Sequence, residues 1–184
     1  HTLIATATSD GSDATLDFTS GIDSTYDVYE FIFTNIHPQS DAQFTFQANA
    51  HDGSSQLTGF NETITSTFFV EWHKEDDSSA GQGYDGNNDQ ANGTSYQPLT
   101  SEIVDSGDAD SSISGILTLY GPSSDTYVKH FMAQTNYFQQ DPAQQNAHIA
   151  GYINTTNAIT QISFKFASGE IQGGEIKMYG LAKS

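Results

Sequence analysis

The chain has 184 residues, a length that suits one domain with a full sandwich or barrel core. Its 23 Asp and Glu residues face five Lys and no Arg, and the formal net charge of -18 argues against nucleic acid or an anionic membrane as a partner. The absence of cysteine excludes a disulfide framework, a thiolate nucleophile and a cysteine-based zinc site.

Alternation of apolar and polar residues with a period of two dominates the chain, and helical periodicity is nearly absent. Aromatic residues make up 12% of the chain and, with the β-branched residues, favour strands. Turns rich in Gly, Asn, Asp, Ser and Pro separate the alternating runs. The predicted strands are 2–8, 14–18, 26–36, 42–50, 62–74, 96–104, 113–120, 127–138, 148–154, 158–167 and 175–181.

The run 26–36 carries large apolar side chains on both faces. Tyr29 and Phe31 would lie on one face, and Val28 and Ile32 on the other. A strand that is apolar on both faces is typical of a central strand with a layer on each side. We therefore predict that this strand is covered on both faces.

The run 42–50 alternates more regularly. Phe44 and Phe46 would point inward, whereas Gln47 and Asn49 would point outward to solvent. This pattern predicts a strand with one buried face and one exposed face.

The run 62–74 predicts a long strand with Phe68, Val70 and Trp72 on one face. The segment 75–95 that follows has no periodicity and is rich in Gly, Asn and Asp. We predict a long acidic loop there, and structureless loops of about 20 residues in compact domains are usually functional or disordered. A second loop is predicted at 139–145, around Asp141 and the proline that follows it.

The even spacing of about eleven strands and their polar turns predicts an all-β fold. We interpret the whole chain, 1–184, as a single antiparallel β-sandwich domain of the jelly-roll type. No repeat of a propeller blade's length is visible in the sequence, so a β-propeller is not favoured.

Catalytic signatures are missing from the sequence. It contains no G-x-S-x-G elbow, no H-E-x-x-H and no phosphate-binding Gly loop. Two of the many carboxylates could form a glycosidase pair, but the sequence does not show which two would meet. We therefore predict a protein that is not an enzyme, and keep a polysaccharide depolymerase as an alternative.

One segment has the alternating oxygen side chains of a calcium loop. Asp85, Asn87 and Asp89 follow a D-x-N-x-D spacing, and Ca²⁺ takes six to eight oxygen ligands at close range. Gln90 stands where an EF-hand loop has Gly, and Tyr96 stands where it has the bidentate Glu. The alternative is a solvated loop without metal.

Asp108 and Asp110 form a second short cluster of oxygen side chains. Both clusters are candidate calcium sites. Neither sequence pattern indicates that the protein requires a cofactor.

The chain has 12 Phe, 9 Tyr and 1 Trp, more aromatic residues than one core face requires. Aromatic side chains with few charges among them suit a protein interface or a surface on which sugars stack. The candidates for a ligand-binding or interface surface are Trp72, Tyr84, Tyr96 and Tyr137. The alternative for each of them is a structural position in the hydrophobic core. The other aromatic residues predicted at exposed positions are Tyr29, Phe69, Tyr127, Phe138 and Tyr152.

Several stretches in chain order resemble one family of small proteins. The family is encoded by marine tailed bacteriophages, including cyanophages and pelagiphages. Its closing pattern S-G-x-I-x-x-G-x-I-K-x-Y-G, present at 168–180, also recurs in other marine phage tail and fibre proteins. The stretches are LIATAT, DATLDFTSGIDSTYDVYEFIFTNIHP, FTFQAN, TITSTFF, GILTLYGPSSDTYVKHF and AGYINTTNAITQISFKFASGEIQGGEIKMYG.

The resemblance implies a virion structural protein at the particle surface, either a tail fibre or appendage module or a capsid decoration protein. The partners it implies are other virion proteins and further copies of the chain, with a homotrimer as the expected assembly. A carbohydrate-binding module that recognises host surface glycans, with calcium as a candidate aid, is the second hypothesis. A depolymerase is the third.

The position of the acidic residues agrees with an outer surface. Nine of the 23 acidic residues lie between Glu75 and Asp110, in two turn-rich segments. The predicted strands are largely uncharged, so the acidity belongs mainly to loops and turns. In sea water the Debye length is below about 8 Å, so the acidic residues of a highly charged chain repel one another only weakly there. We interpret the acidity as an adaptation to salt.

Overall fold

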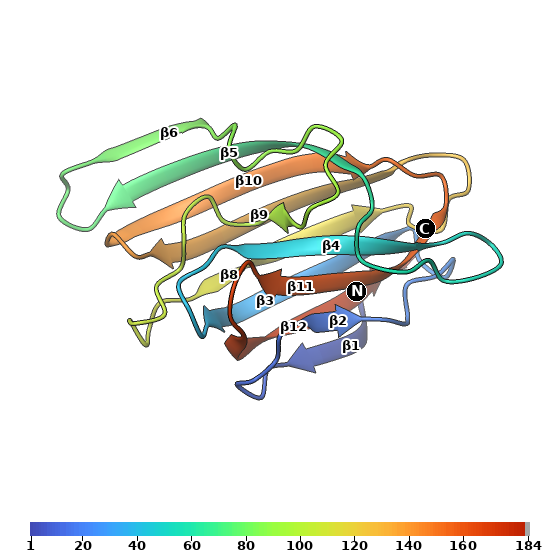
Figure 1. Cartoon of the computed structure of the whole chain (residues 1–184), viewed down its shortest axis with the longest axis horizontal. Helices are drawn as coiled ribbons and strands as arrows, with labels where there is room; N and C mark the ends of the chain where they lie inside the picture. Colours follow the sequence, from blue (N-terminus) through green and yellow to red (C-terminus); the bar gives the residue numbers. More distant parts are fainter. Residues whose placement is uncertain (183–184) are drawn as a thin grey trace.

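The computed structural model describes residues 1–182, and all twelve of their regular elements are β-strands (Figure 1). The alternating sequence pattern is the cause, because it gives each strand one apolar face to bury. The described residues include no helix that is long and apolar enough to cross a bilayer. The strands are β1 (Thr2–Thr8), β2 (Leu16–Phe18), β3 (Val28–Pro38), β4 (Phe44–His51), β5 (Ile64–Lys74), β6 (Ala80–Tyr84), β7 (Gln97–Pro98), β8 (Ile113–Tyr120), β9 (Lys129–Gln139), β10 (Ala143–Ile153), β11 (Ala158–Phe166) and β12 (Ile171–Leu181).

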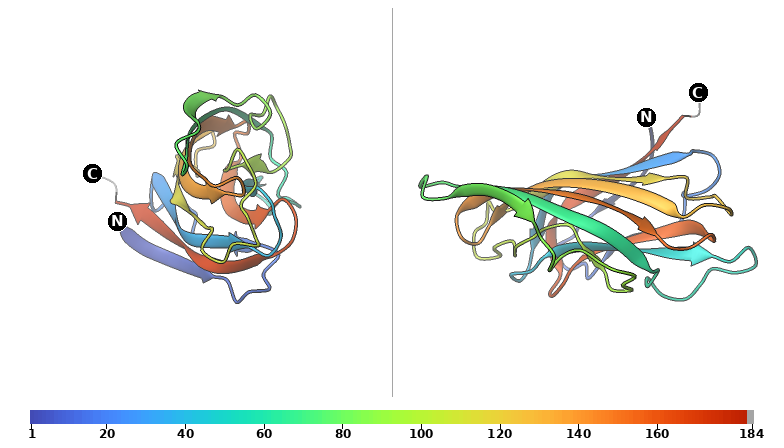
Figure 2. Two further views of the ribbon diagram at one scale, coloured as in Figure 1. Left: turned by 90° about the vertical axis from the view of Figure 1, so that its left-hand side faces the viewer. Right: turned by 90° about the horizontal axis from the view of Figure 1, so that it is seen from above.

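The strands form an eight-stranded and a four-stranded antiparallel sheet that pack face to face (Figure 2). The larger sheet has the order β1-β12-β3-β8-β9-β10-β5-β6, and the smaller has the order β2-β11-β4-β7. The first four strands of the larger sheet and the smaller sheet together have the strand order of an eight-stranded jelly roll. The predicted antiparallel β-sandwich of the jelly-roll type is therefore confirmed, and β9, β10, β5 and β6 extend one edge of the larger sheet.

A cluster of phenylalanine side chains fills the space between the sheets. It forms because the inward positions of strands from both sheets carry large aromatic residues that meet at one level. Phe164 of β11 lies at its centre and is fully buried. The rings with centroids within 6.4 Å of the Phe164 ring belong to Phe18, Phe31, Phe33, Phe44 and Phe46.

The prediction that the strand at 26–36 is covered on both faces is wrong. β3 is central in its sheet, between β12 and β8, and Tyr29 and Phe31 are buried. Ile32 on the other face is 36% exposed, because none of the described strands forms a second layer over the outer face of the larger sheet. Being central in a sheet concerns the hydrogen-bonded edges of a strand and does not decide which of its faces is covered.

The predicted outward face of β4 is also buried. Gln47 and Asn49 were expected in solvent, yet both are buried. The Gln47 amide donates hydrogen bonds to the carbonyl oxygens of Thr94 and Ser95, at 3.2 and 2.9 Å. The segment that precedes β7 therefore covers this face. An amide can be buried when backbone groups satisfy its hydrogen bonds, and the alternation of β4 does not reveal the covering segment.

The predicted long loop at 75–95 contains a strand. β6 pairs antiparallel with β5 and extends the sheet, with Gly81 opposite Trp72. Its sequence, AGQGY, lacks the bulky residues that favour strands, so pairing with β5 outweighs its low strand propensity.

Two other predicted boundaries change. The predicted strand 96–104 is reduced to β7, although Leu99 and Val104 are buried within the loop that follows. The predicted loop 139–145 is shorter, because β9 continues to Gln139 and β10 begins at Ala143.

Candidate functional site

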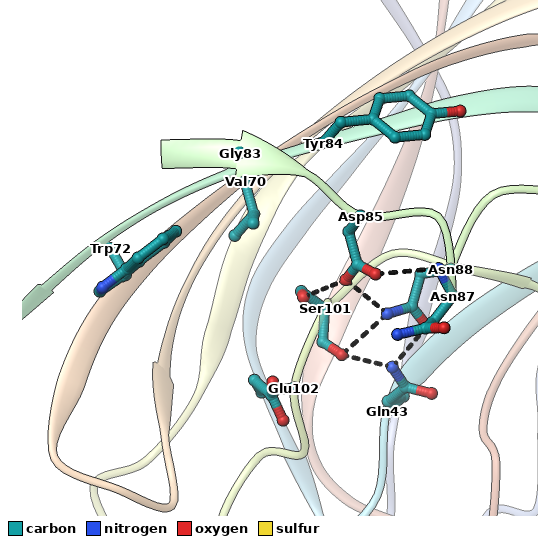
Figure 3. Close-up of a pocket in the computed structure, with 10 residues that line it drawn as sticks. All are labelled: Gln43, Val70, Trp72, Gly83, Tyr84, Asp85, Asn87, Asn88, Ser101 and Glu102. Carbon is teal, nitrogen blue, oxygen red and sulfur yellow. Dashed lines mark hydrogen bonds between the residues drawn. The ribbon is translucent and has the colours of Figure 1, made fainter. Parts of the chain in front are cut away.

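A polar cleft of about 590 Å³ lies beneath the extended edge of the larger sheet (Figure 3). β5 and β6 form one side, and the segments around 85–88 and 101–102 form the other. An adjoining cleft of about 410 Å³ shares Val70, Trp72, Ser101 and Glu102 with it, so the two form one groove. We call this groove the Trp72 cleft.

Trp72 lies where the two parts of the cleft join, and its indole ring is held in place by β6. Gly81 is opposite Trp72 in the sheet, and a Cβ atom at Gly81 would lie only 2.6 Å from the ring. The glycine therefore allows the ring to lie close to the β6 backbone. The indole Nε1 also donates a hydrogen bond to Ser79 Oγ at 3.2 Å. These two contacts set the orientation of the ring.

One end of the cleft is a hydrogen-bonded cluster around Asp85 (Figure 3). The Asp85 carboxylate accepts hydrogen bonds from Asn88 Nδ2 at 2.7 Å and from Ser101 Oγ. Asn88 Oδ1 accepts one from Gln43 Nε2 at 2.8 Å. Burial alone would raise the pKa of Asp85, but the hydrogen bonds from Ser101 and Asn88 outweigh it and hold this pKa below its usual value. Asp85 is therefore an ionised, fixed acceptor.

The three residues of the predicted calcium loop do not share one site. Asp85 accepts hydrogen bonds from its neighbours and from the backbone N–H of Asn87 at 3.1 Å. Asp89 instead accepts a hydrogen bond from the hydroxyl of Tyr84. Within residues 1–182, no three or more His, Cys, Asp or Glu side chains gather as a metal site would require. Calcium binding at this loop stays a prediction.

The second predicted calcium cluster is a group of like charges. Asp108 and Asp110 lie with Glu75 and Phe138 around a cleft of about 410 Å³. A hydrogen bond between the two Asp carboxyls and the negative charge of Asp108 raise the pKa of Asp110. The structure thus brings Asp108 and Asp110 together. Neither of them lines the Trp72 cleft.

The four predicted aromatic candidates separate in the structure. Trp72 and Tyr84 both line the cleft, Tyr84 at its rim. Tyr96 packs under the Lys165 ammonium group, 4.3 Å from the ring centroid, and its hydroxyl donates to Ser163 Oγ at 3.1 Å on the smaller sheet. It is therefore not part of the cleft.

Tyr137 is a core residue, so the prediction that it is exposed is wrong. Its side chain is only 2% exposed. Its hydroxyl donates to Gln145 Oε1 and accepts from the backbone N–H groups of Ser101 and Glu102, at 2.8 and 3.1 Å. Tyr137 thus holds two residues of the cleft in position from below. Tyr29, also predicted at the surface, is buried as well.

Several polar residues of the cleft had no motif to identify them. Glu102 lies in a loop, and Asn88 lies between Asn87 and Asp89 at a position that the predicted calcium pattern does not use. Gln139 and Gln145 occupy inward positions of β9 and β10, where an apolar residue would be expected. A polar residue at an inward strand position is the signal that could have pointed to them.

An apolar groove of about 390 Å³ lies on the opposite, outer face of the larger sheet. It is open to solvent because no layer formed by residues 1–182 covers this face. Met132 is 56% exposed there. The residues that line it include no Asp or Glu and are Thr67, Phe69, Ile116, Thr118, Tyr120, Met132, Ala133, Gln134, His148, Ile149 and Ala150.

Comparison with known proteins identifies no family for this chain. No family model and no curated protein matches it. Among solved structures, it is similar to a Bacteroides ovatus protein whose title gives its function as unknown. The two are 6% identical with a TM-score of 0.32, and the similarity covers 59% of this chain and 46% of that one. The chain therefore spans less than half the length of that protein.

Proposed function

We propose that the chain is a non-enzymatic structural protein of a bacteriophage virion, displayed on the particle surface as a tail fibre or appendage module or as a capsid decoration protein. The observation that carries the proposal is the jelly-roll strand order, because viral capsid proteins and lectins use this fold. A fold by itself permits many functions. The resemblance of the sequence to marine phage proteins is what selects this one.

The test is to locate the protein in purified phage particles by mass spectrometry and cryo-electron microscopy. We expect density for the sandwich on the tail or on the head surface. Its absence from particles that contain the other virion proteins would contradict the proposal.

Self-association, expected as a homotrimer, is part of this proposal. The support is the apolar groove on the outer face, whose lining by the described residues contains no carboxylate in a chain of net charge -18. Two copies repel each other least when they meet through a face that lacks negative charge. The proposed occupant of this groove is therefore a second copy of the chain.

Replacing Met132 with glutamate should dissociate the assembly, because it places a carboxylate in the groove on each copy. We expect a mass near that of a trimer for the natural chain and near that of a monomer for Met132→Glu, measured by light scattering at sea-water salt. Tyr127→Glu is the matched control, because Tyr127 is 73% exposed and lies outside the groove. A natural chain that is monomeric at every concentration would exclude self-association.

Binding of host surface glycan is the second candidate function, and the Trp72 cleft favours it. A fixed indole ring beside carboxylate and amide groups suits sugars, which present apolar C–H faces together with hydroxyl groups. A glycan array with and without calcium tests this candidate. The depolymerase alternative predicts new reducing ends when host polysaccharide is incubated with the protein, and the non-enzymatic proposal predicts none.

A further inference from the structure

The Trp72 cleft contains amide side chains that are almost completely buried and already held in place. Asn88, Gln139 and Gln145 are 8%, 8% and 6% exposed. Asn88 bonds to Asp85 and Gln43, while Gln145 Nε2 donates to Gln139 Oε1. Groups fixed before a ligand arrives lose little conformational freedom when it binds. The cleft is therefore a preorganised polar surface at the β5–β6 edge of the larger sheet.

Glu102 differs from the other carboxylate groups of the cleft because it has no partner. Within the described chain, no hydrogen bond or ion pair reaches its side chain, although Tyr137 holds its backbone N–H. Figure 3 shows the Glu102 side chain apart from the Asp85 cluster. It lines both parts of the Trp72 cleft. Its two oxygens are free to accept hydrogen bonds from a ligand that has hydroxyl donors.

The charge of the cleft selects against an acidic ligand. Among residues 1–182, its carboxylates are Asp85, Glu102 and Asp141, and Lys74 is the only cation that lines it. Lys74 Nζ already lies 2.5 Å from an Asp141 oxygen, so its charge is neutralised locally. A sulfate or carboxylate group here would meet two uncompensated negative charges, and sea-water salt screens such contacts little at short range.

We propose that the Trp72 cleft binds uncharged sugar chains, with one sugar ring on the Trp72 indole and its hydroxyl groups donating to Glu102. This assignment rests on the second candidate function, the binding of glycan, and names its ligand class. It rejects sulfated and uronic acid chains. It needs no calcium, because the polar contacts come from side chains alone.

The test is calorimetric titration of the full chain at sea-water salt with EDTA present. The neutral probes are the hexasaccharides of laminarin, cellulose and β-mannan, and the acidic probes are hexasaccharides of alginate and carrageenan. We expect binding of at least one neutral probe and of neither acidic probe. Trp72→Ala should weaken that binding by about tenfold or more, because it removes the stacking surface.

Two further variants make the outcomes distinct. Tyr127→Ala removes an aromatic side chain that is 73% exposed and lines neither the Trp72 cleft nor the apolar groove, and it should bind as the natural chain does. Glu102→Gln keeps a hydrogen-bonding group and changes a loop residue whose side chain has no partner among the described residues. It should weaken the binding of neutral probes several-fold and allow acidic probes to bind. It therefore tests the cleft even if Trp72→Ala fails to fold.

Each contrary result has its own meaning. If acidic probes bind better than neutral ones and Trp72→Ala abolishes this binding, the proposed ligand class is wrong and the proposed site is supported. Neutral binding that neither Trp72→Ala nor Glu102→Gln affects would overturn the site and keep glycan binding. A folded natural chain that binds no probe would overturn this inference and, if the glycan array is also negative, the second candidate function. The location of the protein in the virion is tested by a separate experiment, so these titrations do not affect that proposal.

Discussion

Replacing Phe164 with alanine should lower the free energy of unfolding by about 3–5 kcal/mol, the range found for Phe to Ala changes in protein cores. The Phe164 side chain is fully buried, and its ring centroid lies 5.2 Å from that of Phe33 and 5.5 Å from that of Phe31. These partners belong to the larger sheet, whereas Phe44, at 6.0 Å, belongs to the smaller one. The substitution therefore leaves a cavity where the two sheets meet.

Urea unfolding followed by circular dichroism measures this loss. Tyr127→Ala is the control, because it removes an aromatic side chain that is 73% exposed and lies outside the apolar groove, and it should cost well under half as much. Equal losses for the two variants would show that the phenylalanine cluster is not the centre of the core.

Replacing Tyr137 with phenylalanine should lower the free energy of unfolding by about 2–3 kcal/mol near neutral pH. The lost hydroxyl leaves the backbone N–H groups of Ser101 and Glu102 and the Gln145 oxygen without this partner. Leaving a buried polar group unpaired costs about 1–3 kcal/mol. The same change should loosen the Ser101 and Glu102 side of the Trp72 cleft.

The stability difference between Tyr137→Phe and the natural chain should also depend on pH. Burial raises the pKa of Tyr137 far above its usual value of 10.0, so the folded chain keeps the phenolic proton when the unfolded chain loses it. Above about pH 10 the natural chain therefore loses about 1.4 kcal/mol of stability per pH unit through this group. The phenylalanine variant lacks this loss, so the difference should shrink as pH rises.

Unfolding curves between pH 8 and pH 11 measure this dependence. Tyr127→Phe is the control, because Tyr127 is largely exposed, and it should follow the natural chain at every pH. A difference for Tyr137→Phe that stays constant over the whole range would contradict a buried, protonated Tyr137.

Much of the fold could be predicted from the sequence, because each strand's alternation is a property of consecutive residues. β1, β5 and β8 begin and end within two residues of their predicted positions, and the inward face of β5 carries Phe68, Val70 and Trp72 as expected. The location of acidic residues in turns was also a local property. β6 was missed because its glycines carry no such pattern, and its pairing with β5 made it a strand.

The candidate site could be predicted only in part. Trp72, Tyr84 and Asp85 were selected from the sequence and do line the cleft, but the calcium pattern that selected Asp85 does not describe its contacts. Glu102 had no sequence signal of its own. Gln145 is a polar residue at an inward strand position, but 139–145 was predicted as a loop, so this signal was not seen. They reach the cleft because one lies in a loop and the other on a distant strand that the sheet order brings beside β5.

The sequence by itself determined that the chain forms strands, which residues alternate along them, and where the negative charge lies, because these depend on neighbouring residues. Only the tertiary structure decided which faces are covered. Gln47 is buried by a loop about 50 residues away, while Ile32 in a central strand stays uncovered. The reason is physical. Burial and hydrogen bonding depend on which distant segment lies against a face, and the period-two pattern of a strand is the same whether that segment is present or not.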